Sequence, residues 1–211
     1  MKQLNIRTEE IQKPNLGRAD WLRSALHCLI KDGIDAVQIT RLATSLGVSR
    51  GSFYWHFKLR QDLLDGLLEE WSAANSQCIA DVLARSDSLD RGVLSIFAVW
   101  TDPSQFSSPL EQAVRDWARL DESVLDKVRA EDANRLATLS AFFQRFDYSE
   151  HEAIVRARVL YFAQVGYYAM NVNEALEARM SMLDLYYLTF TGRRLDRGVS
   201  EEFQRDWQMF T

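Results

Sequence analysis

Along most of this 211-residue chain, apolar residues recur at intervals of three and four positions. That spacing is typical of α-helices that bury one face. The first such stretch begins at Arg18 and has its apolar positions at Trp21, Leu22, Ala25, Leu26, Leu29 and Ile30. Lys31 and Asp32 then lead to Gly33, which we predict to end this helix as a left-handed cap.

Two shorter helical patterns follow between Ile39 and Phe57. The buried face of the first is formed by Ile39, Leu42, Ala43 and Leu46, with Thr40 predicted as its N-cap. Gly47 permits the positive φ angle that a sharp turn needs. The second helix is predicted over Ser49–Phe57, with Ser49 as its N-cap. The segment therefore predicts two helices that are joined by a tight turn.

The second of these helices has an unusual outward face. Phe53 and Phe57 are one turn apart and should face the interior. Arg50, Tyr54 and Trp55 must then face outward to differing degrees. A short helix that exposes a tyrosine and a tryptophan suggests a surface that binds something.

The rest of the chain continues the helical pattern. Further helices are predicted at Arg60–Ala84, Leu89–Trp100, Pro109–Leu120, Glu122–Phe146, Ser149–Met170 and Glu174–Phe190, with a short one from Ser200. Strand-like alternation of useful length is absent from the sequence. We therefore predict an all-α fold of about nine or ten helices, with a first domain at residues 1–60 and a second at 61–211. Residues 1–16 are predicted to form a mobile arm.

Composition narrows the possible classes of protein. The sequence has 47% hydrophobic and 26% charged residues, which is ordinary for a globular chain. It has no run of about 18 apolar residues that would span a membrane, and its beginning lacks the apolar core of an export signal. Cys28 and Cys78 are predicted to be buried, reduced thiols. A cytoplasmic protein without metal or cofactor is expected.

The net charge of −5 is unevenly distributed. Residues 1–60 hold ten lysines and arginines against five acidic residues, whereas the remainder holds 15 against 25. The first quarter is thus positive and the body negative. This distribution fits contact with nucleic acid at one end of the molecule, although a basic solvated face would give the same count.

The two-helix segment has the form of a helix–turn–helix, in which the second helix enters the major groove of DNA. Arg50 can reach a guanine edge or a phosphate, and Gly51 lets the backbone approach closely. Tyr54 and Trp55 offer polar hydrogens and apolar contact with thymine methyl groups. The candidate DNA-binding residues are Thr40, Arg50, Gly51, Ser52, Tyr54, Trp55, His56, Lys58 and Arg60.

Residues from about Arg18 to Trp71 resemble the DNA-binding region of the TetR family of transcriptional repressors. The resemblance rests on the amphipathic first helix, on the segment ITRLATSLGVS, and on GSFYWHFK followed by a leucine-rich helix. It implies three N-terminal helices that bind DNA and a larger helical body that dimerises and binds a small effector. The body matches less specifically, so the resemblance there concerns architecture alone.

One position departs from the family pattern. A small capping residue such as serine or asparagine often follows the HFK segment, but this chain has Leu59. A leucine side chain cannot accept hydrogen bonds from the first amides of the next helix. The departure leaves the geometry of Arg60, a candidate phosphate contact, unsettled.

The resemblance also implies that the last two large helices pair across a two-fold axis. Candidate residues of this homodimer interface are Ile154, Tyr161, Phe162, Val165, Gly166, Met180, Leu183 and Tyr187. Candidate effector-binding residues are the aromatic and polar side chains Trp100, Trp117, Phe142, Tyr161, Gln164 and Tyr168. At helical spacing, each aromatic residue of this set is also a candidate for the plain core.

The leading functional hypothesis is a ligand-responsive repressor that binds a palindromic operator as a homodimer. An enzyme is not expected, because the chain lacks the common nucleophile, phosphate-loop and zinc motifs, and its three histidines are scattered. The alternative is a helical DNA-binding regulator or adaptor that responds to no small molecule. Effector, operator sequence and the choice between repression and activation stay open.

Overall fold

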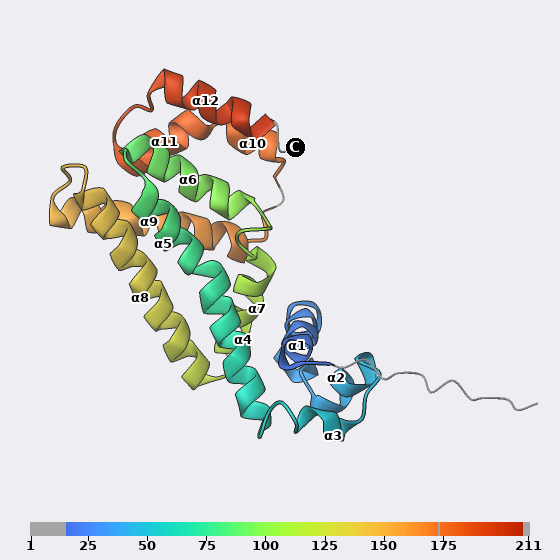
Figure 1. The fold of residues 1–211 in the computed structure, drawn as a ribbon. Coiled ribbons are helices and arrows are strands. Elements are labelled where there is room, and N and C mark those ends of the chain that lie inside the picture. The colour runs from blue at the N-terminus through green and yellow to red at the C-terminus, as the bar shows by residue number, and fades with distance from the viewer. Residues whose placement is uncertain (1–15, 173, 209–211) are drawn as a thin grey trace, which may run out of the picture. The chain divides into compact units, whose positions relative to one another are not determined.

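The computed structural model describes residues 16–172 and 174–208. Within them the chain forms twelve α-helices and one 3₁₀ helix, and no strand (Figure 1). The predicted arm at residues 1–16 lies almost wholly outside the described residues. The elements are α1 (Arg18–Asp32), η1 (Ile34–Ala36), α2 (Ile39–Ser45), α3 (Arg50–Phe53), α4 (Arg60–Asn75), α5 (Gln77–Arg85), α6 (Leu89–Thr101), α7 (Ser108–Ala118), α8 (Glu122–Gln144), α9 (Glu150–Ala169), α10 (Leu176–Ser181), α11 (Leu183–Thr191) and α12 (Arg197–Gln208).

The all-α prediction is confirmed, but the helices are more numerous than predicted. The helix predicted over Arg60–Ala84 is interrupted at Ser76, and the one predicted over Glu174–Phe190 is interrupted at Met182. At the first break, Ser76 gives its hydroxyl proton to Glu131, and its oxygen accepts from Arg135. Tertiary hydrogen bonds, which helical periodicity cannot register, therefore coincide with this break.

The chain divides into two compact units, residues 1–67 and 68–211, and the boundary falls inside α4. The sequence placed the domain boundary seven residues earlier, after residue 60. In the N-terminal unit, α1 packs against η1 and α2, and α2 packs against α3. Its interior includes Trp21, Leu29, Leu42 and Phe53, each at most 1% exposed.

The C-terminal unit is built around α8 and α9, which pack along each other. A second layer of contacts joins α5 with α6, α5 with α8, and α9 with α11. Its hydrophobic core includes Ile79, Ile96, Leu139, Phe142 and Phe143, all at most 2% exposed. This core gives the unit a rigid interior against which the candidate site residues can be placed.

One glycine of this unit is required by packing. A Cβ atom at Gly92 in α6 would lie 2.1 Å from Cζ of Phe142 in α8. That distance is far inside van der Waals contact, so α6 can approach the phenylalanine ring only because position 92 has no side chain. The sequence prediction gave no account of this close approach.

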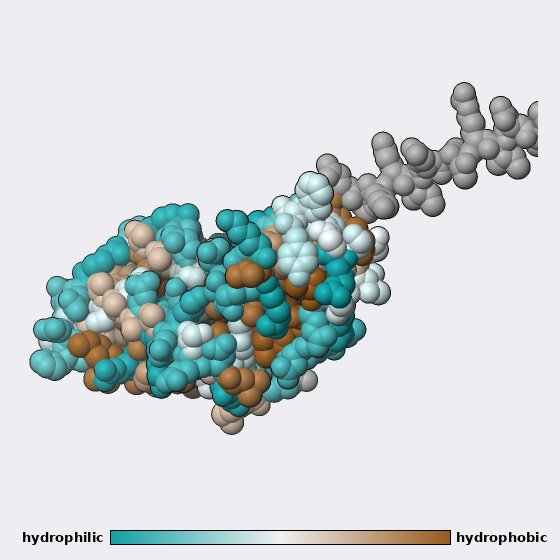
Figure 2. Space-filling view, turned by 90° about the horizontal axis from the view of Figure 1, so that it is seen from below, coloured by the Kyte–Doolittle hydropathy of each residue, from teal (hydrophilic) through white to brown (hydrophobic). Residues whose placement is uncertain are grey.

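The surface is mixed in character. On the face shown in Figure 2, hydrophilic side chains dominate and hydrophobic ones lie in smaller groups. Among the described residues, no helix combines the length and the apolar character that a membrane crossing requires. Of the two cysteines, Cys28 is buried as predicted, whereas Cys78 is only partly buried, and both are free thiols.

Candidate nucleic-acid interface and effector cavity

The turn between α2 and α3 has the geometry predicted for it. Gly47 has a φ angle of 67°, which glycine adopts without strain. The amide of Val48 donates to the carbonyl of Ala43 at 3.0 Å and closes the end of α2. Ser49 is the N-cap of α3, but its side chain makes no capping hydrogen bond.

The helices on either side differ from the prediction. Helix α2 begins at Ile39 with Gln38 as its N-cap, so Thr40 lies inside the first turn. Helix α3 is only four residues long, where the sequence predicted Ser49–Phe57. Beyond Phe53 the chain continues in tighter turns, in which the amides of Tyr54 and Trp55 donate to carbonyls three residues earlier. Gly33 has the predicted positive φ of 80°, but its ψ of 177° is extended and not left-handed helical.

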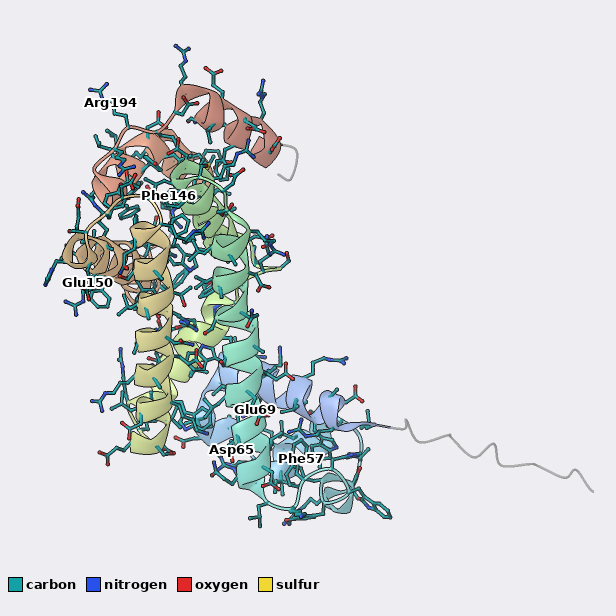
Figure 3. All side chains as sticks on the ribbon, turned by 60° about the vertical axis from the view of Figure 1, so that its left-hand side comes forward. Phe57, Asp65, Glu69, Phe146, Glu150 and Arg194 are labelled. Atoms are coloured by element: carbon teal, nitrogen blue, oxygen red, sulfur yellow. The ribbon has the colours of Figure 1, made fainter. Side chains whose placement is uncertain are left out.

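A stack of aromatic rings supports α3 from inside. Phe53 meets Trp21 edge to face at 5.3 Å and lies parallel to Phe57 at 5.1 Å between ring centroids. The guanidinium of Arg18 lies over the Phe57 ring at 5.1 Å. Phe57 points into the interior of the unit (Figure 3). Both phenylalanines are core residues, and the backbone of α3 is therefore held in a fixed position.

The opposite side of this segment is open to solvent. Tyr54 is 54% and Trp55 is 87% exposed. Of the other predicted DNA-binding residues, Thr40, Arg50, Gly51, Lys58 and Arg60 are exposed, and Ser52 and His56 are half-buried. The segment thus presents two large aromatic side chains together with positive charge. The two aromatic side chains are adjacent in sequence and form an exposed apolar surface beside the basic groups.

The start of α4 is capped by Asp62, although Leu59 at the N-cap position has no capping side chain. The carboxylate of Asp62 accepts hydrogen bonds from the amide of Lys58 at 2.8 Å and from the amide of Leu59 at 3.0 Å. Asp62 therefore supplies the reverse half of a capping box, in which the third helical residue reaches back to the N-cap amide. The Nε of Arg60 donates to the carbonyl of Val37 at 3.1 Å, so its guanidinium is tied to the N-terminal unit.

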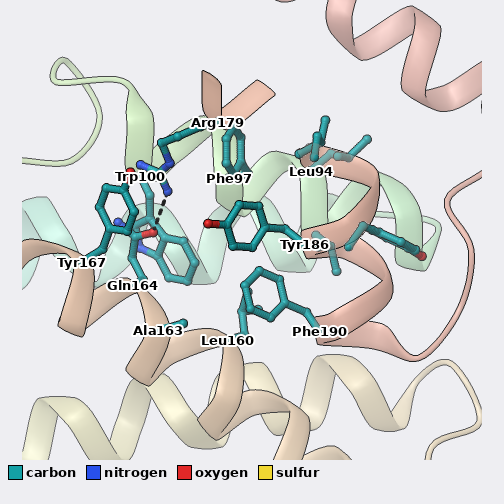
Figure 4. Close-up of a pocket in the computed structure, with 13 residues that line it drawn as sticks. Leu94, Phe97, Trp100, Leu160, Ala163, Gln164, Tyr167, Arg179, Tyr186 and Phe190 are labelled. Carbon is teal, nitrogen blue, oxygen red and sulfur yellow. Dashed lines mark hydrogen bonds between the residues drawn. The ribbon is translucent and has the colours of Figure 1, made fainter. Parts of the chain in front are cut away.

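A cavity opens in the C-terminal unit between α6, α9, α10 and α11. The empty space between its lining residues, counted together with space that is open to solvent, is about 540 Å³. Figure 4 shows aromatic side chains around it, with Arg179 and Gln164 joined by a hydrogen bond at one end. The lining residues are mostly apolar: Val93, Leu94, Phe97, Trp100, Leu160, Ala163, Gln164, Tyr167, Arg179, Leu183, Tyr186, Tyr187 and Phe190.

Two of the six predicted effector-binding residues, Trp100 and Gln164, line this cavity. The other four do not line it. Trp117 and Phe142 are buried core residues, Tyr161 belongs to a polar network described below, and Tyr168 donates its hydroxyl proton to the Trp100 carbonyl. The sequence prediction missed Arg179, Tyr167 and Tyr186. Arg179 and Tyr186 lie on either side of a helix break at Met182 that was not predicted, and Tyr167 lies in α9 without a distinguishing sequence signal.

A buried polar network lies at the centre of the C-terminal unit. Glu111 in α7, 1% exposed, accepts hydrogen bonds from Trp71 Nε1 at 2.7 Å, from Arg115 Nε at 2.9 Å and from Arg135 Nη1 at 2.9 Å. Asn75 adds a fourth donor at 3.1 Å. Burial alone would raise the pKa of Glu111, but Arg135 and its hydrogen bonds, with Arg115, hold that pKa below its usual value.

Tyr161 extends this network to α9. Its hydroxyl accepts from Arg135 at 3.0 Å and from Arg115 at 3.0 Å, and donates to Asp132 at 2.6 Å. Burial raises the pKa of Tyr161, so the phenol remains neutral. Side chains from α4, α7, α8 and α9 therefore meet in one continuous set of charge-assisted hydrogen bonds.

The predicted dimer residues fall into two groups. Tyr161, Leu183 and Tyr187 are at most 3% exposed, which leaves them little surface to offer a second copy. Phe162 is 55% exposed, and the remaining predicted residues, Ile154, Val165, Gly166 and Met180, are half-buried. The prediction did not include Val155 and Val159, which are exposed on α9 together with Phe162 at helical spacing.

The fold and the exposed surface of α3 define the class: a helix–turn–helix protein with a helical body. Residues 22–67 match the family described as bacterial regulatory proteins, tetR family. Over 54 residues the chain is 41% identical to tetracycline repressor protein class A from transposon 1721 of Escherichia coli, which is 26% of this chain and 25% of that protein. Over residues 22–67, the N-terminal unit is thus similar to regulatory proteins of the TetR family.

The matched segment spans only about a quarter of the length of the curated relatives. Solved structures match more of the chain. Salmonella enterica GusR superposes with a TM-score of 0.60 at 17% identity, covering 88% of this chain and 94% of that one. A chain from Mesorhizobium loti assigned to the TetR family gives a TM-score of 0.57 at 17% identity, covering 93% and 97%. At these identities the likeness concerns the fold alone.

Proposed function

We propose that this chain is a cytoplasmic, non-enzymatic transcriptional regulator that binds a palindromic DNA operator as a homodimer. A small molecule in the cavity of the C-terminal unit lowers its affinity for that operator. The observation that carries the proposal is the exposed aromatic and basic surface of residues 50–58, which lies in the segment that matches the TetR family. The curated relatives are tetracycline repressors, and repression is proposed by analogy with them.

Several features support DNA as the partner of this surface. The turn at Gly47 and the aromatic stack beneath α3 hold the helix rigidly. Rigid presentation reduces the conformational entropy that is lost on binding. Tyr54 and Trp55 supply apolar contact area and one polar hydrogen each, and Arg50 and Lys58 supply charge for phosphate or guanine.

A homodimer is proposed because α9 exposes an apolar stripe. Val155, Val159 and Phe162 are separated by four and three residues and are 56%, 43% and 55% exposed. Exposed apolar stripes of this kind favour contact with another protein surface. A Cβ atom at Gly166, on the same helix, would meet nothing within 4 Å in the single chain. The glycine is thus not needed by the fold of one protomer, and a close approach by a second copy would account for it.

The same helix, α9, links the cavity to the polar network. Gln164 faces the cavity, and Tyr161, nearly one turn earlier, bonds to Arg135 and Arg115. Arg135 in turn bonds to Ser76, which directly follows α4. Glu111 bonds to Trp71, which lies near the end of α4. Helix α4 continues without interruption into the N-terminal unit. A ligand that shifts α9 is proposed to act on DNA binding along this route, with the reciprocity that linkage requires.

The proposal is tested by a protection assay on the DNA upstream of the gene, followed by selection from random sequence. We expect protection of one palindromic site, with two half-sites about 34 Å apart along the duplex. Binding should weaken with salt, because phosphate contacts release counterions. Absence of any protected or selected site would contradict the proposed function.

A regulator or adaptor that keeps the fold but responds to no ligand is the second candidate. The lining of the cavity argues against it, because mostly apolar walls with a few polar groups are typical of small-molecule sites. Thermal unfolding against a panel of metabolites separates the two candidates. Ligand binding to the folded state raises the apparent stability, so a flat response across the panel would favour the alternative.

A further inference from the structure

The cavity of the C-terminal unit has one charged side chain in its lining, Arg179, and no described residue forms an ion pair with it. Among the described residues, no carboxylate oxygen lies within 4.0 Å of the Arg179 guanidinium. Instead the guanidinium lies over the ring of Tyr167 at 4.1 Å and over that of Phe97 at 5.2 Å. These contacts hold the plane of the group but leave its charge unneutralised.

The nearby carboxylate of Glu174 is engaged elsewhere. It accepts the hydroxyl proton of Tyr167. Burial and this hydrogen bond raise the pKa of Tyr167 to about 12, so the phenol keeps its proton and remains hydrogen-bonded to Glu174. Arg179 is therefore left as a positive charge among aromatic faces, with Gln164 as its polar neighbour.

Gln164, which also lines the cavity, has one buried side-chain atom without a hydrogen-bond partner. Its residue is 7% exposed, and its Oε1 accepts from Arg179 Nη2 at 3.3 Å. This bond fixes the orientation of the amide, because a flipped amide would set one donor against another. The Nε2 atom then has no hydrogen-bond partner, and neither does Nε of Arg179. Burial raises the pKa of Tyr168, and a hydrogen-bonding interaction with the Gln164 side chain opposes this rise, but Nε2 of Gln164 does not reach hydrogen-bond geometry with any described group.

Two buried donors without acceptors, one of them charged, are costly in a folded protein. They lie together at one end of a space whose other walls are Phe97, Trp100, Tyr186 and Phe190. A bound group that satisfied them must accept two hydrogen bonds, carry negative charge and be attached to an apolar body. A planar carboxylate meets the first two requirements, since guanidinium and carboxylate match in geometry.

From these contacts the geometry points to an aromatic carboxylate as the ligand of this cavity. Its carboxylate accepts from Nε of Arg179 and Nε2 of Gln164, and its ring lies among the aromatic walls. This inference rests on the proposed function in taking the cavity as the effector site. The net negative charge of the C-terminal unit would by itself favour a cationic ligand. The inference is the opposite, because the charged side chain in the cavity, Arg179, is positive.

The test uses the purified full chain and three probes that share a phenyl ring: phenylacetate, phenylacetamide and 2-phenylethylamine. Isothermal titration calorimetry should show phenylacetate binding about tenfold or more tightly than either the amide or the amine. Arg179→Met should abolish that preference, and Gln164→Leu should weaken phenylacetate binding alone. Arg129→Met, which changes an exposed arginine of α8, is the matched control and should bind like the wild type.

Equal or tighter binding of the amide or the amine would overturn the inference, as would the absence of binding by all three probes. Arg179→Lys is a second variant, which keeps the positive charge but lacks the planar N–H donors of a guanidinium. It should retain part of the preference for phenylacetate. The protection assay on DNA is run in parallel without probe. Protected DNA with no preference for phenylacetate would overturn the ligand class alone, whereas phenylacetate binding without any protected DNA would overturn the proposed function.

Discussion

Two arginines of the C-terminal unit, Arg135 and Arg179, are held in opposite ways. The guanidinium of Arg135 bonds to Glu111, to the Ser76 hydroxyl and to the Tyr161 hydroxyl, and its side chain is 2% exposed. That of Arg179 bonds only to an amide oxygen among the described residues. A satisfied buried charge fixes the arrangement of the helices around it, whereas an unsatisfied one beside a cavity indicates a site for a ligand.

Arg135 and Arg179 should contribute differently to the stability of the fold, because only Arg135 belongs to a buried ion pair. Removing one partner of a buried ion pair leaves the other charge uncompensated, which is much more costly than losing an exposed pair. Arg179 is only half-buried, and it has no ion pair to break among the described residues. The comparison therefore predicts that two substitutions of the same chemical kind have very different effects on the fold.

The largest effect is expected for Arg135→Met. The variant leaves Glu111 buried with Arg115 as its remaining guanidinium partner and removes the hydrogen bonds to Ser76 and Tyr161. We expect the free energy of unfolding to fall by about 3–5 kcal/mol. Urea denaturation followed by circular dichroism measures it. A loss below about 1 kcal/mol would show that the network is not what holds the four helices together.

The dependence of folding stability on pH tests the buried pairing of Glu111 with Arg135 in a second way. The pKa of Glu111 is lower in the folded state than its ordinary value of 4.5. Its contribution to stability is therefore fully present above that pH and is lost as the pH falls toward the folded-state pKa. We expect the stability of the wild type to drop as the pH falls below the ordinary glutamate pKa of 4.5, and the curve for Glu111→Gln to be flatter in that acidic range. Parallel curves for the two proteins would contradict this assignment.

The smallest effect is expected for Arg179→Met. Its contacts with the Tyr167 and Phe97 rings are lost, but the cost of burying an unpaired charge disappears with them. The change in the free energy of unfolding should stay within about 1 kcal/mol, by the same urea measurement, with Arg129→Met as the exposed control. A destabilisation as large as that of Arg135→Met would erase the contrast between the two arginines.

Local sequence patterns predicted the helices and the turn at Gly47, because those depend on residues close together in the chain. The short α3, the break at Ser76 and the capping role of Asp62 depend on contacts that periodicity cannot register. The cavity shows the same limit. Trp100 and Gln164 were predicted from their chemistry, but Arg179 is a lone arginine in an ordinary helical pattern. Only the fold shows that, among the residues it describes, no carboxylate pairs with this arginine.

The proposed DNA-binding function depends on the surface formed by residues 50–58. One measurement tests that surface directly. Fluorescence anisotropy with labelled upstream DNA compares the wild type with Tyr54→Ala and with Leu120→Ala, a change at a 73% exposed leucine of the C-terminal unit. The account predicts that Tyr54→Ala weakens specific binding by about tenfold or more, while Leu120→Ala binds like the wild type and all three proteins unfold at similar temperatures. Equal DNA affinity of Tyr54→Ala and the wild type would contradict it.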